Sequence, residues 1–166
     1  MYISIEVIIL KFKWKTFIVC LIIPLAVGGL SAVITQNSMQ VFDTLTKPPL
    51  SPPGWLFPVA WTILYILMGI ASYLVINSNA ESNEITKALK FYFLQLAVNF
   101  FWPIFFFKFN LYLFSFLWLV LLWVLIICTM VSFYKISKPA GYLLIPYLIW
   151  VTFAGYLNLS IYILNK

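Results

Sequence analysis

Aromatic and amide side chains recur at helical spacing in three apolar segments of this 166-residue chain. The members are Trp61, Tyr65, Met68 and Ser72 in the first segment, Gln95, Asn99, Trp102 and Phe106 in the second, and Tyr147, Trp150, Ala154 and Asn158 in the third. Steps of three or four residues place each set on one face of a helix. Their amides and hydroxyls could orient a ligand by hydrogen bonding, and their rings could stack on a flat apolar molecule.

Two interpretations of these three stripes stay open. Polar groups are costly in lipid, so we expect them to face the interior of a helix bundle. There they could act only as interhelical hydrogen bonds, each worth about 1 kcal/mol, with the aromatic rings as packing. Alternatively, the stripes converge on an aromatic-lined cavity with a few orienting polar groups, which is the usual makeup of a small-molecule site.

The elements that carry the stripes are predicted to be membrane helices. Hydrophobic residues make up 64% of the chain and charged residues only 8%. In a soluble domain, roughly a quarter of all residues are charged. The segments long enough to cross a bilayer, at about 20 apolar residues each, are Thr16–Thr35, Leu56–Ile76, Ala88–Phe107, Leu111–Phe133 and Gly141–Leu164. We therefore predict an all-α membrane protein, a five-helix transmembrane bundle in a single domain over residues 1–166, with residues 1–15 along the interface.

The charge is one-sided, with ten lysines, no arginine and four acidic residues, for a net charge of +6. The lysines stand at the ends of the apolar runs, where they anchor helices among lipid headgroups, so we expect no nucleic-acid partner. Seven of the ten belong to the N-terminal tail and to the second and fourth connections. This excess predicts a cytoplasmic N-terminus and an outward-facing connection between the first two helices.

Residues for several kinds of chemistry are missing. The chain has no histidine, and Cys20 and Cys128 stand alone in apolar runs, so a disulfide framework, a zinc site and His-ligated haem are not expected. No metal and no required cofactor is predicted. General acid–base and nucleophilic catalysis also lack candidate residues, which disfavours an enzyme and leaves only tryptophan photochemistry open. An ion relay is disfavoured because the helices lack charged interior positions.

Five of the nine prolines cluster between Pro48 and Pro58, in the connection between the first two helices. Proline restricts φ, so such a loop can hold one shape without helical hydrogen bonds. Its apolar side chains favour a stiff lid over the mouth of the bundle; the alternative is an interfacial loop with Trp55 in the aromatic belt. The predicted lid residues are Pro48, Leu50, Pro52, Pro53 and Trp55.

Proline and glycine also occur inside the predicted helices. Pro24, Pro103 and Pro146 each remove a helical hydrogen bond and should interrupt or kink their helices, leaving room between them. The pair Gly28–Gly29 permits close approach of a backbone, in a neighbouring helix or in a second subunit.

Three long segments together resemble one known family. They are "DTLTKPPLSPPGWLFPVAWTILYILMGIASYLV", "QLAVNFFWPIFFF" and "PYLIWVTFAGYLN", within a stretch from about Gly28 to Asn158. In order and spacing they are similar to the TspO/MBR family, which includes the tryptophan-rich sensory proteins of bacteria and the mitochondrial translocator protein, or peripheral benzodiazepine receptor.

The resemblance implies a five-helix bundle, usually a homodimer, with an apolar pocket under the first loop. It implies binding of porphyrins such as protoporphyrin IX or haem, of cholesterol-like sterols and of benzodiazepine-site ligands. Bacterial members are linked to tetrapyrrole sensing, transport and stress regulation, and a light-dependent porphyrin breakdown by pocket tryptophans is the alternative. A bacterial cell membrane is the implied location.

The resemblance also assigns residues. Trp61 and Trp150 match the family's two pocket tryptophans, which would be the photochemical residues if such chemistry occurs. Asn99 and Tyr147 match lining positions, and Ala154 matches the small residue behind the ligand. The chain departs from the family at Val41–Phe42, where an aromatic pair is common, and at Leu50, where tryptophan is frequent. A sterol-binding pattern can be read at Leu159, Tyr162 and Lys166.

Overall fold

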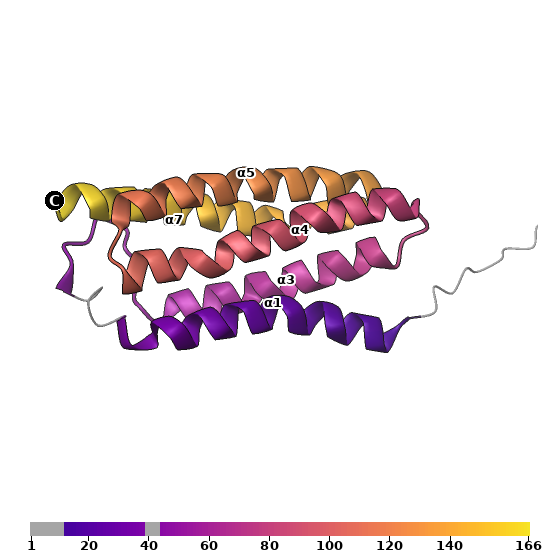
Figure 1. Cartoon of the computed structure of the whole chain (residues 1–166), viewed down its shortest axis with the longest axis horizontal. Helices are drawn as coiled ribbons and strands as arrows, with labels where there is room; N and C mark the ends of the chain where they lie inside the picture. The colour runs from indigo at the N-terminus through magenta and orange to yellow at the C-terminus, as the bar shows by residue number, and fades with distance from the viewer. Residues whose placement is uncertain (1–11, 39–43) are drawn as a thin grey trace, which may run out of the picture.

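The chain folds into a bundle of long antiparallel helices (Figure 1). A computed structural model describes residues 12–38 and 44–166. Its long helices are α1 (Trp14–Thr35), α3 (Leu56–Ile76), α4 (Ser82–Pro103), α5 (Tyr112–Ile136) and α7 (Ile145–Leu164). Three short turns extend them: the 3₁₀ turn η1 (Gln36–Ser38), the π-helical turn η2 (Ile104–Lys108) and the short helix α6 (Lys138–Tyr142).

These helices confirm the predicted fold class. In the part of the chain that the structure describes, five helical spans are long and apolar enough to cross a membrane. They are Trp14–Ser38, Leu56–Ile76, Ser82–Lys108, Tyr112–Ile136 and Lys138–Leu164. The chain is thus an all-α, multi-pass integral membrane protein.

Several helices are longer than the apolar runs that predicted them. α4 begins at Ser82, six residues before the predicted start, so Glu84 and Lys87 also lie inside the helix. A helix can continue through polar residues into the headgroup region because its backbone is satisfied internally, and Glu84 in the first turn suits the helix dipole. α1 begins at Trp14 rather than at residue 16, and residues 1–11 of the predicted interfacial segment lie outside the described residues.

Two of the three helix prolines coincide with breaks in the α-helical pattern. Pro103 ends α4, and the following turn is π-helical, with the Phe109 N–H donating to the Ile104 carbonyl at 3.1 Å. Pro146 stands in the first turn of α7, just after the break that separates α6 from α7. A proline in the first turn loses no hydrogen bond, since that N–H has no helical partner. α1 continues through Pro24.

The glycine pair has two different surroundings. α1 packs mainly against α3, while α4 packs against α5 and α5 against α7. A Cβ at Gly28 would overlap the ring of Tyr65, so this glycine permits close approach of α3 to α1. Gly69 does the same on α3, where an added Cβ would lie 2.8 Å from the Cys20 carbonyl oxygen. Gly29 meets no atom of the described chain.

The helix ends define two faces of the membrane. The start of α1, the α3–α4 connection and the start of α6 lie at one end, and the proline-rich loop and the C-terminus lie at the other (Figure 1). The connections whose lysines predicted the orientation therefore lie at the same end as the start of α1.

We expect the proline-rich loop to be accessible from outside the cell. In a background with both native cysteines replaced, an impermeant maleimide should label Leu50→Cys, whose parent side chain is 81% exposed, and should spare Ser82→Cys. Labelling is measured in intact cells. Both positions should react after the membrane is permeabilised, and the opposite pattern in intact cells would reverse the orientation.

Candidate ligand-binding site

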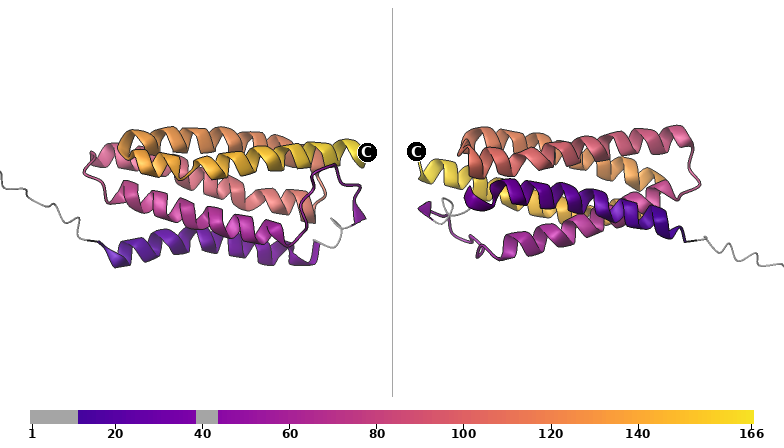
Figure 2. Two further views of the ribbon diagram at one scale, coloured as in Figure 1. Left: turned by 180° about the vertical axis from the view of Figure 1, so that it is seen from behind. Right: turned by 60° about the horizontal axis from the view of Figure 1, so that its bottom comes forward.

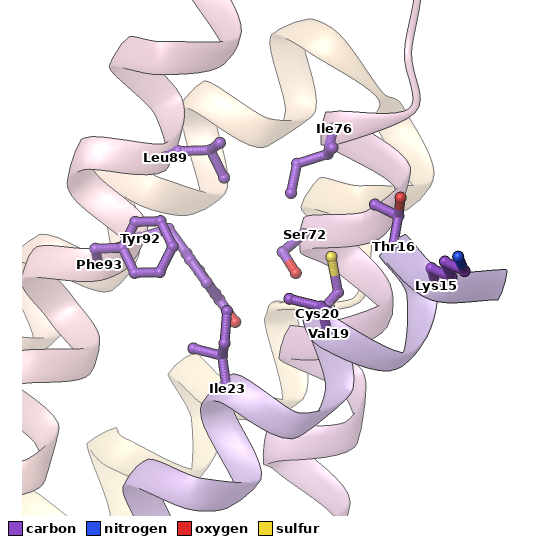
Figure 3. Close-up of a pocket in the computed structure, with 10 residues that line it drawn as sticks. All are labelled: Lys15, Thr16, Val19, Cys20, Ile23, Ser72, Ile76, Leu89, Tyr92 and Phe93. Carbon is purple, nitrogen blue, oxygen red and sulfur yellow. The ribbon is translucent and has the colours of Figure 1, made fainter. Parts of the chain in front are cut away.

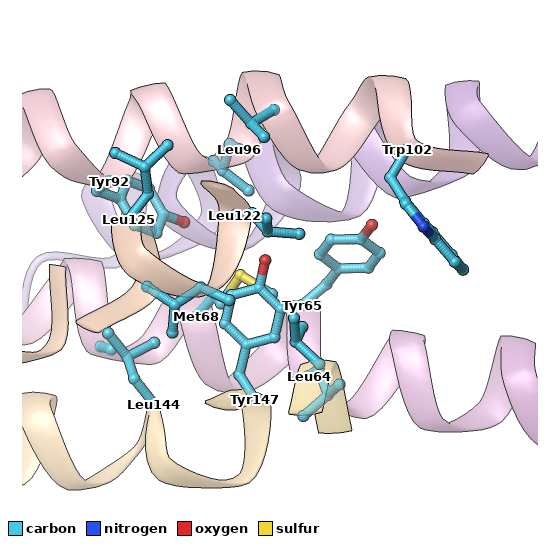
Figure 4. Packing of buried hydrophobic residues seen from close by; sticks show 14 of the residues in the cluster. Leu64, Tyr65, Met68, Tyr92, Leu96, Trp102, Leu122, Leu125, Leu144 and Tyr147 are labelled. Atoms are coloured by element: carbon cyan, nitrogen blue, oxygen red, sulfur yellow. The ribbon is translucent and has the colours of Figure 1, made fainter. Parts of the chain in front are cut away.

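The polar members of the three stripes meet in one hydrogen-bonded network. The Tyr65 hydroxyl donates to Asn99 Oδ1 at 3.3 Å, and Asn99 Nδ2 donates to the Tyr147 hydroxyl at 2.7 Å. The Tyr147 hydroxyl donates in turn to Gln95 Oε1 at 2.9 Å, and Gln95 Nε2 lies 3.8 Å from Met68 Sδ. Figure 4 shows the rings of Tyr65 and Tyr147 pointing from their own helices toward α4.

This network ties three helices together. All five side chains are buried, and they come from α3, α4 and α7. Buried polar groups in proteins are nearly always hydrogen-bonded, and here they are satisfied by one another. The network has the arrangement expected of interhelical hydrogen bonds.

A second polar pair lies closer to the proline-rich loop. Trp102 Nε1 donates to Asn158 Oδ1 at 3.2 Å, and Asn158 Nδ2 donates to the Tyr112 carbonyl at 2.7 Å. These bonds join α4, α7 and the start of α5. They also fix the plane of the Trp102 indole, because its single donor has a partner.

A cavity of about 340 Å³ opens at the same end of the bundle. It lies between α1, α3, the end of α4 and the last residues of the proline-rich loop. Its lining residues are Gly28, Ser31, Ala32, Thr35, Gly54, Trp55, Phe57, Pro58, Trp61, Tyr65, Trp102, Pro103 and Phe107. None of these described lining residues is charged, and the volume is at the lower end of the range of small-molecule sites, roughly 300–1,000 Å³.

Three aromatic rings form one wall of this cavity. The ring of Trp61 stacks on Tyr65 with centroids 5.6 Å apart and lies 6.3 Å from the ring of Trp102. Trp61 also meets Tyr147 edge-on at 6.1 Å. Because Tyr65 and Tyr147 belong to the network, the wall is braced by the hydrogen bonds that hold α3, α4 and α7 together.

All the predicted ligand-binding residues except Trp150 fall into three groups. Trp61, Tyr65 and Trp102 line the cavity. Phe106, Ala154 and Asn158 line a space of about 20 Å³ behind it, which shares Phe57, Trp102 and Phe107 with the cavity. Gln95, Asn99 and Tyr147 belong to the network and do not line the cavity.

Trp150 has a different position from the one expected for a lining tryptophan. Its ring meets Phe57 edge-on at 6.0 Å, and Phe57 lines the cavity whereas Trp150 does not. Its Nε1 is buried without a hydrogen-bond partner among the described residues. Trp150 would therefore act on a ligand through Phe57.

The proline-rich loop is tied to α7. The Thr46 N–H donates to Asn165 Oδ1 at 2.9 Å, and Asn165 Nδ2 donates back to the Thr46 carbonyl at 3.0 Å. The Tyr156 hydroxyl donates to the Pro49 carbonyl at 3.0 Å. Figure 2 shows the described part of the loop, from residue 44 on, passing near the C-terminus before the chain enters α3.

The predicted lid residues do not all face the cavity. Trp55 lines it, while Pro48, Leu50, Pro52 and Pro53 do not. Leu50 is exposed and has a φ of 68°, in a turn closed by the Ser51 N–H and the Pro48 carbonyl at 3.3 Å. A positive φ at this position is characteristic of glycine or asparagine, so leucine is strained here. The departure at Val41–Phe42 lies outside the described residues.

Sequence reasoning missed the wall that α1 contributes. Gly28, Ser31 and Thr35 follow steps of three and four residues, and this stripe of small residues was the signal available. Both hydroxyls already donate within the bundle, Ser31 to the Phe100 carbonyl at 3.0 Å and Thr35 to the Ser31 carbonyl at 2.9 Å. The α1 wall is therefore smooth and offers little hydrogen bonding to a ligand.

The described residues contain no group of three histidine, cysteine or carboxylate side chains placed to hold a metal ion. What the site offers is an uncharged aromatic cavity in a helical membrane protein.

The fold and this cavity define a small polytopic membrane protein with an aromatic pocket at one end of the bundle. The sequence pattern of the TspO/MBR family matches residues 20–164, and the chain belongs to that family. It is 41% identical to the tryptophan-rich protein TspO of Chlorobaculum tepidum, over 90% of this chain and 96% of the relative. It is 34% identical to the tryptophan-rich sensory protein of Cereibacter sphaeroides (94% and 95% covered) and 33% identical to the translocator protein of Bos taurus (87% of each).

Proposed function

We propose that this protein binds porphyrins, with protoporphyrin IX or haem as the ligand, in the cavity beneath the proline-rich loop. The observation that carries the proposal is the aromatic wall of Trp61, Tyr65 and Trp102 beside an uncharged cavity. Indole and phenol rings offer a flat apolar macrocycle large contact areas and stacking geometry. Sterols and benzodiazepine-site ligands share the flat apolar character and belong to the same proposal.

The size and polarity of the cavity indicate how a porphyrin would enter. A space of about 340 Å³ admits part of a macrocycle, and its walls offer no cation for a carboxylate. Burying an unpaired propionate there would be costly. The ligand therefore enters with an apolar edge first, and its propionates stay near the headgroups at the loop.

Light-dependent breakdown of protoporphyrin IX is the second candidate function. It is favoured by the Trp61–Trp102 contact, which places two indoles 6.3 Å apart at the cavity wall. Binding alone would suit a role in tetrapyrrole sensing, transport or stress regulation.

Titration with protoporphyrin IX tests the proposal. Saturable quenching of tryptophan fluorescence is expected in the dark, in detergent, and excess of a non-fluorescent sterol or benzodiazepine-site ligand should reverse it. Porphyrin absorption that falls only under light, with a new product, would support breakdown. Tryptophan quenching that rises linearly with porphyrin concentration and does not saturate would contradict binding.

We also propose a homodimer in a bacterial cell membrane. α1 is the least buried of the described membrane spans, and Gly29 on its outer side meets no atom of its own described chain. A small residue facing lipid leaves space for a partner helix to approach closely.

The prolines of the loop are expected to slow ligand release. Replacing Pro48, Pro49, Pro52 and Pro53 with alanine should lower affinity through a faster dissociation rate, because the loop then loses entropy on closing, up to about 1 kcal/mol per substitution. The melting temperature of the ligand-free bundle should change little, since Thr46 and Asn165 still tie the loop to α7. Stopped-flow release of protoporphyrin IX measures the dissociation rate. Equal rates in the wild type and the four-proline variant would show that the loop lies at the interface and does not act as a lid.

A further inference from the structure

A second cavity, of about 300 Å³, lies at the opposite end of the bundle from the aromatic wall. We name it the amino-end cavity because the first turns of α1 border it. Its lining residues are Lys15, Thr16, Val19, Cys20, Ile23, Ser72, Ile76, Leu89, Tyr92 and Phe93 (Figure 3). It shares no residue with the cavity proposed to bind porphyrin.

A buried tyrosine hydroxyl borders this cavity. Tyr92 is 2% exposed, and its hydroxyl lies beside the Ser72 hydroxyl and the Cys20 thiol without a hydrogen bond of good geometry to either. The Ser72 hydroxyl donates to the Gly69 carbonyl at 2.9 Å. Figure 3 shows Tyr92, Ser72 and Cys20 directed toward the same space. Buried hydroxyls are nearly always paired, so the Tyr92 hydroxyl at this cavity wall can still donate a hydrogen bond to a ligand or a water.

A cation stands at the mouth of the cavity. Lys15 is exposed in the first turn of α1 and forms no ion pair within the described chain, and no acidic residue lines the cavity. Lys13 precedes it by two residues and is also exposed. The charge of the site is therefore positive and favours an anionic group at headgroup level.

The side of the cavity is open to lipid. Val19, Ile76 and Phe93 line it and are also exposed on the outer surface of the bundle. Five residues separate Lys15 from Cys20, about 7.5 Å along a helix. The interfacial layer of one leaflet is roughly 5–7 Å deep, so the cysteine, and with it the polar end of the cavity, lies near the boundary with the hydrocarbon.

We propose that the amino-end cavity binds an acidic glycerophospholipid. Its phosphate pairs with Lys15, an ester carbonyl accepts from the Tyr92 hydroxyl, and one acyl chain lies between Val19 and Phe93. The order of groups in such a lipid, from anion to acceptor to hydrocarbon, is the order that the cavity offers from its mouth to its lipid-facing side.

Native mass spectrometry of the full chain released from detergent tests the proposal. We expect one phosphatidylglycerol to be retained in preference to phosphatidylcholine of the same chains. Lys15→Gln should reduce that preference about fivefold, the effect of one lysine near an anionic surface. Tyr92→Phe should weaken retention about threefold to tenfold, the usual effect of one hydrogen bond.

Matched variants separate this site from general lipid contact. Lys135→Gln removes an exposed lysine at the same end that does not line the cavity, and Tyr134→Phe removes an exposed hydroxyl there. Val19→Trp places an indole over the lipid-facing side of the cavity. Val33→Trp, its control, places an indole on an exposed part of α1 that does not line the cavity. Only the cavity variants should lose phosphatidylglycerol, and the affinity for protoporphyrin IX should be unchanged in all of them.

Three outcomes would overturn the proposal. Equal retention of the two phospholipids in the wild type would show annular lipid only. Equal losses in the Lys15 and Lys135 variants would show a general charge effect. Retention unaffected by Tyr92→Phe and by Val19→Trp would show that the cavity holds water and no lipid. Because porphyrin binding is measured separately, failure here leaves the proposed function intact.

Discussion

Trp61→Leu is expected to weaken protoporphyrin IX binding roughly 10- to 30-fold while the protein stays folded. Trp61 is the aromatic residue that stacks on Tyr65 and approaches Trp102 at the cavity wall. Leucine keeps an apolar side chain there but removes the indole face, a loss of about 1.5–2 kcal/mol of stacking and contact area. Fluorescence titration in detergent measures the affinity, and the melting temperature reports folding.

The series around this substitution makes the effect specific. Trp61→Phe keeps a ring and should lose only about threefold. Trp14→Leu is the matched control, because Trp14 is 67% exposed at the other end of the bundle. Trp150→Phe should have a smaller effect than Trp61→Leu, since Trp150 contacts Phe57 but does not itself line the cavity. Equal affinities of Trp61→Leu and Trp14→Leu for protoporphyrin IX would show that Trp61 does not contact the ligand.

Asn99→Leu is expected to destabilise the ligand-free bundle by about 2 kcal/mol, the cost of buried groups left unpaired. Asn99 accepts from Tyr65 and donates to Tyr147, so it bridges α3 and α7 from α4. Leucine has a similar volume but leaves the Tyr65 hydroxyl without its acceptor. For a chain of this size the melting temperature should fall by roughly 4–8 °C, measured by thermal unfolding in detergent.

A double-mutant cycle with Tyr147→Phe isolates the interaction between the two side chains. The expected coupling is about 0.6–1.7 kcal/mol, the range of hydrogen bonds between membrane helices. Thr152→Val is the control, because its hydroxyl pairs with Trp123 on the exposed side of α5 and α7. Independent effects of Asn99→Leu and Tyr147→Phe would mean that the amide does not join the helices. A loss of porphyrin affinity without destabilisation would instead make Asn99 a ligand contact.

The polar stripes thus divide into residues that join the helices and residues that line the cavity. Hydrogen bonds join Gln95, Asn99 and Tyr147 to one another and hold the bundle together. Trp61 and Trp102 face the cavity. Periodicity identified the inward face of each helix but not the depth at which each side chain meets a partner, because depth depends on how neighbouring helices are offset along their axes.

The sequence by itself determined the membrane solvent, the helix-rich fold and the inward faces, since hydrophobicity and helical period are local properties of the chain. It also contained the family resemblance. Only the tertiary structure decided that α1 supplies a wall of the cavity, that Phe57 and not Trp150 lines it, and that the Tyr92 hydroxyl borders a second cavity. Cavities and unpaired groups arise between helices distant in the chain, so the packing of those helices, and no local pattern, places them.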